Sequence, residues 1–221
     1  MRHAHQHAAR TFDLLGGRLC LDFSNTVGGK RLREPVEKLR TWNDLVSWGR
    51  QAGALSDDLA RRLDAEGQRR PGEAAAALRR AVDLREALFR IFRAAAEGAE
   101  PAAEDLELVN SALSRARSHE RVIRAGGRYR LAFPEGEAGL DAVLWPVVRS
   151  AAELLTSDEV ARVRICEATR VDGCGWLFLD ETRNGTRRWC SMKDCGNRAK
   201  ARRHYRRSKA AARREPGASR R

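Results

Sequence analysis

Apolar residues recur at intervals of three and four positions through much of the chain before residue 156. Such spacing predicts amphipathic helices, each with one face toward a core. The longest predicted helix covers residues 71–96 and carries a stripe that includes Leu84 and Leu88. Shorter helices are predicted in four further segments, residues 42–53, 56–66, 102–116 and 140–155. Pro146 lies inside the last of these, so we expect that helix to start near Trp145 or to kink there.

Short segments of alternating or continuous apolar character predict strands around this helical framework. Residues 12–27 predict a strand pair or a strand followed by a turn. Antiparallel pairs are predicted between residues 121–123 and 128–133, and between residues 162–166 and 174–180. The fold class is therefore α+β. We expect a mainly helical N-terminal domain over residues 1–160, with a few short antiparallel strands, and a small C-terminal module over residues 161–221 packed against it.

Four of the five cysteines lie in one short segment with the spacing C-x7-C-x15-C-x4-C: Cys166, Cys174, Cys190 and Cys195. The first two would lie on the paired strands, and Ser191-Met-Lys-Asp194 has the form of a capping box that places Cys195 at a helix start. Four thiolates complete a tetrahedral Zn²⁺ site with no open position for catalysis. Two disulfides or unlinked buried thiols are the alternatives. The first ten residues carry no apolar segment of a secretory signal, so we expect a reducing compartment, which favours zinc.

Positive charge is concentrated after residue 160. Residues 161–221 contain 18 Lys or Arg against 6 Asp or Glu, a net charge of +12, whereas the whole chain has +13. A Zn²⁺ ion with four thiolates is formally −2, so the loaded segment retains about +10. Residues 198–214 are rich in Ala, Arg and Lys and predict a helix that lacks a broad apolar face. This concentration of charge is typical of nucleic-acid binding, with a solvated basic tail as the alternative.

The segment Cys195-Gly-Asn-Arg198, preceded by Trp189-Cys-Ser-Met192 and followed by Lys200-x-Arg-Arg203, resembles the CGNR zinc-finger family. Its N-terminal ABATE domain is matched by Gly17-x-x-Cys-Leu-Asp-Phe-x-Asn-Thr26, by Gly139-Leu-Asp141 and by Trp145-Pro146. The resemblance covers essentially the whole chain. It implies a stress-induced bacterial transcription regulator with a treble-clef-like zinc finger, made of a β-hairpin and a basic helix. It also implies that one structural Zn²⁺ is bound by Cys166, Cys174, Cys190 and Cys195.

We expect sequence-specific binding of double-stranded DNA, with the zinc-pinned helix in the major groove. Arg and Lys pair with guanine and Asn pairs with adenine, so Lys193, Asn197, Arg198 and Arg202 are candidate base readers. Asn197 and Arg198 could instead support the zinc site. The candidate phosphate contacts are Arg183, Arg187, Arg188, Lys200, Arg203, Arg206 and Arg207. The alternatives are RNA or non-specific nucleic-acid binding, and an adaptor that binds an acidic protein.

Asp22, Asn25 and Thr26 gather polar groups at the end of a predicted strand, where a pocket for a small-molecule effector could form. Turn and cap chemistry is the alternative. No catalytic triad order, dinucleotide fingerprint or paired-carboxylate motif stands out, so we expect that the chain is not an enzyme. No segment approaches the ~20 apolar residues of a membrane span. We therefore expect a cytoplasmic protein without a membrane partner, associated with the nucleoid when on DNA, and a homodimer formed through the N-terminal domain.

Overall fold

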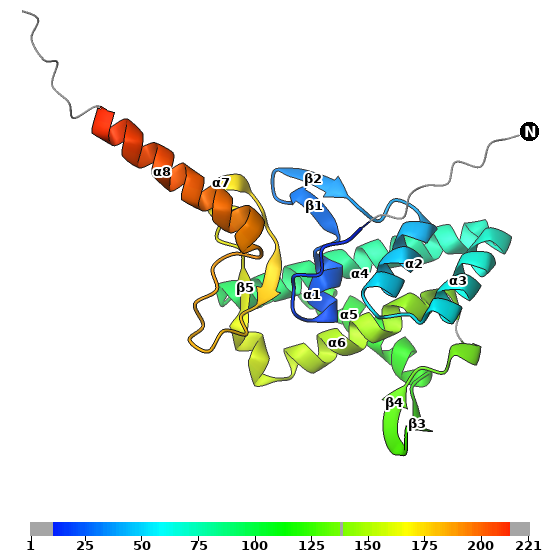
Figure 1. Ribbon diagram of the computed structural model, residues 1–221. Helices are drawn as coiled ribbons and strands as arrows, with labels where there is room; N and C mark the ends of the chain where they lie inside the picture. The colour runs from blue at the N-terminus through cyan, green and yellow to red at the C-terminus, as the bar shows by residue number, and fades with distance from the viewer. Residues whose placement is uncertain (1–10, 138, 213–221) are drawn as a thin grey trace, which may run out of the picture.

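The computed structural model describes residues 11–137 and 139–212, and Figure 1 shows how their elements are arranged. The α-helices are α1 (Leu19–Ser24), α2 (Trp42–Gln51), α3 (Asp57–Arg69), α4 (Pro71–Glu97), α5 (Ala103–Ser118), α6 (Trp145–Leu155), α7 (Thr169–Asp172) and α8 (Asn197–Ala212). The strands are β1 (Val27–Lys30), β2 (Glu34–Glu37), β3 (Arg121–Ala125), β4 (Arg128–Ala132), β5 (Val163–Ile165) and β6 (Leu177–Leu179). Short 3₁₀ turns are η1 (Glu135–Glu137), η2 (Leu140–Leu144) and η3 (Asp158–Arg162), and η4 (Met192–Gly196) is a turn of π-helix.

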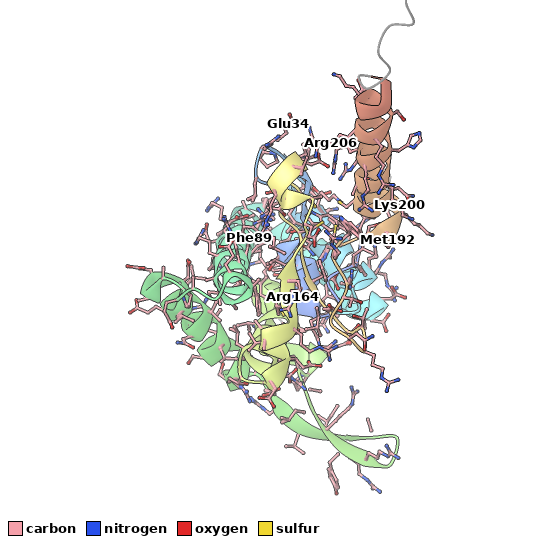
Figure 2. All side chains as sticks on the ribbon, turned by 90° about the vertical axis from the view of Figure 1, so that its left-hand side faces the viewer. Glu34, Phe89, Arg164, Met192, Lys200 and Arg206 are labelled. Carbon is pink, nitrogen blue, oxygen red and sulfur yellow. The ribbon has the colours of Figure 1, made fainter. Side chains whose placement is uncertain are left out.

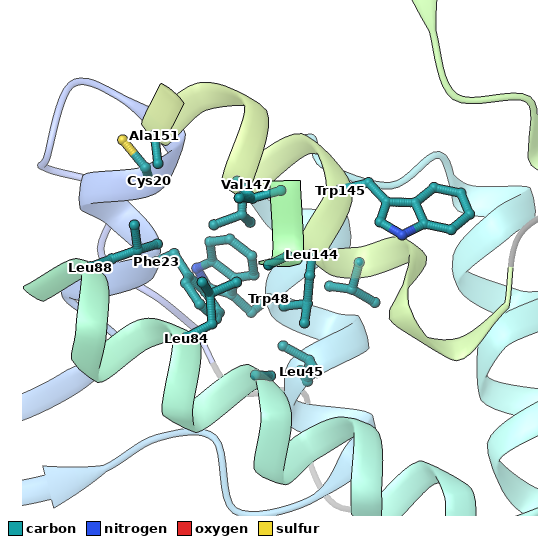
Figure 3. Close-up of a cluster of buried hydrophobic side chains, with 14 of the residues drawn as sticks. Cys20, Phe23, Leu45, Trp48, Leu84, Leu88, Leu144, Trp145, Val147 and Ala151 are labelled. Carbon is teal, nitrogen blue, oxygen red and sulfur yellow. The ribbon is translucent and has the colours of Figure 1, made fainter. Parts of the chain in front are cut away.

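The core forms around α4, which contacts α1, α2, α3 and α5 along its length. Leu84 and Leu88 of α4 are almost completely buried, as the apolar stripe of the sequence predicts. Figure 3 shows them beside Phe23 of α1 and Trp48 of α2. The rings of Phe23 and Trp48 lie 4.8 Å apart between their centroids, a tilted contact favourable for aromatic pairs. The predicted helical framework is therefore confirmed.

Helix boundaries follow the capping chemistry of the sequence. Thr41 and Asp44 form a reciprocal capping box at the start of α2, and Ser56 accepts a hydrogen bond from the main chain at the start of α3. The segment before Pro146 forms the 3₁₀ turn η2, and α6 begins at Trp145, so the predicted late start is confirmed. Within the described residues, no helix is long and apolar enough to cross a membrane.

The prediction of a strand pair, or of a strand plus turn, within residues 12–27 is wrong, because Leu19–Ser24 forms the short helix α1. This helix packs against α4, α6 and β6, so Cys20, Leu21 and Phe23 are all buried although they do not share one face. A helix of six residues enclosed on several sides shows no helical period in its sequence, and its apolar run resembles a buried strand.

Three two-stranded antiparallel sheets are present in the described residues. The pairs β3–β4 and β5–β6 are the predicted hairpins, and Figure 1 shows β3–β4 extending away from the helices. The pair β1–β2, which joins residues 27–30 to residues 34–37, was not predicted because its strands contain Gly28, Gly29 and Pro35, residues that disfavour strands. Val163, Leu177 and Leu179 of β5–β6 belong to the main core, so the C-terminal module packs against the N-terminal domain.

Gly67 in α3 provides a packing test of this fold. A Cβ atom at residue 67 would lie 2.3 Å from Nε1 of Trp42, a buried indole that donates a hydrogen bond to the carbonyl of Leu63. We expect Gly67→Ala to lower the free energy of unfolding by about 1–3 kcal/mol, because this clash outweighs the gain in helix propensity. Gly72→Ala is the matched control, since no atom lies within 4 Å of its Cβ position and alanine should stabilise α4 by about 0.5–1 kcal/mol. Urea denaturation of both variants measures the difference, and equal shifts would contradict the packing around Trp42.

Candidate metal centre and nucleic-acid interface

The four clustered cysteines come from four separate places in the C-terminal module. Cys166 follows β5, Cys174 precedes β6, Cys190 precedes the turn η4, and Cys195 lies within η4. Their sulfur atoms all lie within 4.8 Å of one another, and all four residues are buried. The Sγ atom of Cys190 lies 3.8 Å from that of Cys174 and 3.6 Å from that of Cys195. The Sγ atoms of Cys195 and Cys174 lie 3.7 Å apart.

These distances fit one zinc ion. A tetrahedral site with Zn–S bonds of about 2.3 Å has sulfur–sulfur edges of about 3.8 Å. A disulfide bond is only about 2.05 Å long, and all five cysteines are free thiols in the structure. Four thiolates fill the coordination sphere, so the ion is structural. The prediction of one structural Zn²⁺ is confirmed.

Local main-chain geometry sets the positions of the ligands. The N–H of Cys166 donates to the carbonyl of Trp176, which closes the β5–β6 hairpin beside the first two ligands. Gly173 ends α7 with a φ of +73°, a conformation that favours glycine, and returns the chain toward Cys174. The side chain of Ser191 accepts a hydrogen bond from the N–H of Asp194, so the predicted cap at the start of η4 is present.

Cys20 has a different environment from the four ligands. It is completely buried in α1, and burial raises the pKa of its thiol to about 12. A thiol with such a pKa stays protonated at neutral pH and is a poor nucleophile and metal ligand. Cys20 therefore behaves as a small apolar residue of the core.

The N-terminal domain forms hydrogen bonds with main-chain groups of the zinc module. Leu177 in β6 pairs on its outer edge with the side-chain amide of Asn25, at 2.8 and 3.0 Å. The N–H groups of Arg31 and Leu32 donate to the carbonyls of Cys174 and Gly173. These contacts include the loop that carries the zinc ligand Cys174, so the N-terminal domain helps to hold the metal centre in place.

The structure gives protein partners to the three residues of the predicted effector pocket. Asn25 is the bridge to Leu177, and the hydroxyl of Thr26 donates to the carbonyl of Phe23. Asp22 accepts a 2.7 Å hydrogen bond from the N–H of Gly16, and burial raises the pKa of its carboxyl to about 6. These contacts match the turn and cap alternative. A ligand pocket at this position stays a prediction.

Several of the predicted nucleic-acid residues have partners inside the module. The guanidinium of Arg187 donates to the carbonyls of Leu15 and Cys190 and lies over the ring of Phe178. Arg188 pairs with Glu167.

Residues at the start of α8 also have internal partners. The Nη1 atom of Arg202 lies 2.6 Å from each carboxylate oxygen of Asp172 in α7. Arg198 donates to the sulfur of Cys195 at 3.1 Å, and its Nε lies 3.7 Å from the same Asp172. The side chain of Asn197 donates to the carbonyl of Lys193. Arg198, with its charge beside a thiolate, thus lies where a residue supporting the zinc site would be expected.

The other predicted nucleic-acid residues are exposed, and none has an ion-pair partner within residues 11–137 and 139–212. They are Arg183, Lys193, Lys200, Arg203, Arg206 and Arg207. Figure 1 shows α8, which carries the last four, extending away from the body of the molecule. Asp172, the partner that holds α8, was not predicted from the sequence, because an Asp-Gly pair between strands is typical of a turn.

Comparison with known families agrees with this arrangement. The family ABATE, described as "Putative stress-induced transcription regulator", matches residues 17–158, and the CGNR zinc finger matches residues 162–208. No relative was found among curated proteins. The ABATE match covers more than half of the chain, and the four cysteines of the metal centre lie within the CGNR match. The chain therefore belongs to the ABATE family of transcription regulators and carries a CGNR zinc finger at its C-terminal end.

Proposed function

We propose that this protein is a transcription regulator that binds double-stranded DNA through α8 and depends on zinc to do so. The observation that carries the proposal is the position of Cys195, two residues before α8 begins at Asn197. Because a metal ligand fixes the start of the helix, zinc also fixes the direction in which the helix presents its cations. A basic tail without such an anchor would have no defined orientation.

The dimensions of α8 support duplex DNA as the partner. Its 16 residues span about 24 Å at about 1.5 Å per residue, and a helix fits the DNA major groove of about 12 Å width. Lys200, Arg203, Arg206 and Arg207 are exposed along it, and each phosphate that its arginines neutralise would release counterions and favour binding. Residues 1–160 would then form the domain that senses an effector or mediates assembly, including the expected homodimer.

The test is a selection from random DNA duplexes at near-physiological salt, with zinc-loaded protein and with protein treated with a chelator. We expect an enriched motif only with zinc, and at least a tenfold loss of affinity for that motif after chelation, which corresponds to about 1.4 kcal/mol. Loss of zinc releases the start of α8, so the cations lose their common direction. A parallel measurement with structured RNA separates the two nucleic acids.

Two outcomes would contradict the proposal. Tighter binding to RNA than to any duplex DNA would favour the RNA alternative. An absence of binding to either nucleic acid would favour an acidic protein as the partner of the basic helix.

A further inference from the structure

A groove separates α8 from the segment that contains α7 and Trp189. Its volume is about 470 Å³, and its charged and aromatic lining comes from Glu167, Arg188, Trp189, Arg202, Arg203, Arg206 and Arg207. Figure 2 shows Arg206 on the α7 side of α8 and Lys200 on the other side. The side chains of α8 therefore divide into one set that faces the groove and another that faces away from it.

The groove is suited to phosphate groups. Arg203, Arg206 and Arg207 have no ion-pair partner within the described part of the chain, whereas Glu167 in the groove wall is paired with Arg188. Guanidinium groups bind phosphate oxygens through two parallel hydrogen bonds, which makes arginine the preferred residue for such sites. Three guanidinium groups without an ion-pair partner in that part of the chain, spaced over little more than one turn of one helix, match the repeated charges of a nucleic-acid backbone.

The edge of the groove-lining face that lies nearest α7 is attached to the body of the module, and Arg202 itself lines the groove. Arg202 and Arg198 both approach Asp172 of α7, a carboxylate whose side chain is only 16% exposed. Arg198 also donates to the zinc ligand Cys195. These contacts hold α8 against rotation about its own axis and give both guanidinium groups a protein partner, although the Arg198 and Arg202 side chains stay 44% and 32% exposed.

Helical geometry then defines the free face. With 3.6 residues per turn, Lys200 and His204 lie about 100° and about 140° around α8 from Ala199, which lines the groove. Arg198 and Arg202 lie on the other side of Ala199, at about −100° and about −60°. Lys200 and His204 are both exposed, follow one another by one helical turn and lie just outside the groove-lining arc, beyond its Arg207 edge at about 80°.

We propose that the phosphates of one DNA strand occupy the α7–α8 groove and that Lys200 and His204 therefore face the base edges. The proposal rests on the DNA-binding function proposed above and assigns the specificity-determining residues within it. In the major groove, a lysine ammonium donates to O6 and N7 of guanine, and an imidazole N–H can donate to a purine N7. Arg202, in contrast, is a positioning residue that orients α8 through Asp172.

Single alanine variants test this assignment by duplex selection and by affinity measured against salt concentration. Arg203→Ala and Arg206→Ala are expected to weaken binding to all duplexes alike and to lower the salt slope by about one each. Lys200→Ala and His204→Ala are expected to relax the selected motif at one or two adjacent base pairs, with about a 10- to 100-fold loss on the preferred site and little loss on scrambled DNA.

Two controls separate base reading from charge and from folding. Lys209→Ala removes one positive charge from α8 near its attached edge, and it should leave the motif unchanged. Arg202→Ala should lower the thermal stability of the zinc module and leave the preferred bases unchanged at temperatures where it is folded. The zinc content and helical content of every variant are measured first.

An unchanged motif in both Lys200→Ala and His204→Ala would overturn the assignment, and so would a changed motif in folded Arg202→Ala. Duplex binding by the wild-type protein without any enriched motif would also overturn it, while leaving DNA binding itself intact. Failure of the wild-type protein to bind DNA would instead refute the proposed function.

Discussion

Replacement of Cys190 by serine is expected to release the zinc and to lower the stability of the entire chain in one transition. Serine retains a hydroxyl, but this group is a much weaker zinc ligand than a thiolate. The apparent free energy of zinc binding in zinc-finger peptides is about 10–16 kcal/mol at pH 7. The free energy of unfolding of a typical domain is about 5–15 kcal/mol. Loss of even a third of the zinc-binding free energy would therefore remove much of the stability.

The single transition follows from the shared core. Val163, Leu177 and Leu179 come from the strands of the zinc module and pack among the helices of the N-terminal domain. The loop of Cys174 is also hydrogen-bonded to the main chain of Arg31. Disorder at the metal centre therefore exposes apolar surface of the main core, so the ABATE region and the zinc finger should unfold together.

Thermal unfolding and native mass spectrometry of Cys190→Ser check this prediction, with Cys20→Ala as the control. Cys20 is buried outside the cluster, so its alanine variant should retain one zinc per chain and lose only about 1 kcal/mol from a small cavity. Two separate unfolding transitions in the wild-type protein would contradict the shared core. Retention of tightly bound zinc by Cys190→Ser would contradict the assignment of Cys190 as a ligand.

Local chemistry explains why the larger helices and the metal centre could be predicted from the sequence. The helix α4 has one continuous apolar face. The capping residues of α2 and α3 form hydrogen bonds with residues fewer than four positions away in the sequence. The cysteine cluster lies within 30 residues, and its zinc chemistry depends on ligand type more than on distant structure. In each case, the information that determines the feature is close in sequence.

The features that escaped prediction depend on distant partners. Charge made Arg187 and Arg202 candidates for DNA contacts, but the sequence does not show that Leu15 and Asp172 receive their hydrogen bonds. Asn25 was placed in a possible effector pocket, whereas its partner Leu177 is 152 positions away. The sequence therefore identifies which groups can make polar contacts, and the fold decides which of them are already used.

Asn25→Ala is expected to lower the free energy of unfolding by about 2–5 kcal/mol. The residue is 2% exposed, and its amide bonds both the N–H and the carbonyl of Leu177. On its inner side, β6 pairs with β5, so Asn25 takes the place of a neighbouring strand on the outer edge. Alanine would leave two buried main-chain groups without partners, at about 1–3 kcal/mol each. Asn43→Ala is the control, because Asn43 is exposed on α2 and its replacement should change stability by less than about 0.5 kcal/mol.

A second variant at the same position, Asn25→Asp, separates hydrogen bonding from packing. Aspartate has nearly the same shape, but its ionised carboxylate cannot donate to the carbonyl of Leu177. Burial should raise the pKa of this carboxyl in the folded state above its unfolded value of about 3.9. The folded variant then binds more protons than the unfolded chain, so its stability relative to the wild-type protein should increase as the pH falls from 7 toward 5. Urea denaturation at several pH values measures this difference. A deficit independent of pH would contradict burial of the carboxyl, and the absence of any deficit would show that Asn25 acts through its volume alone.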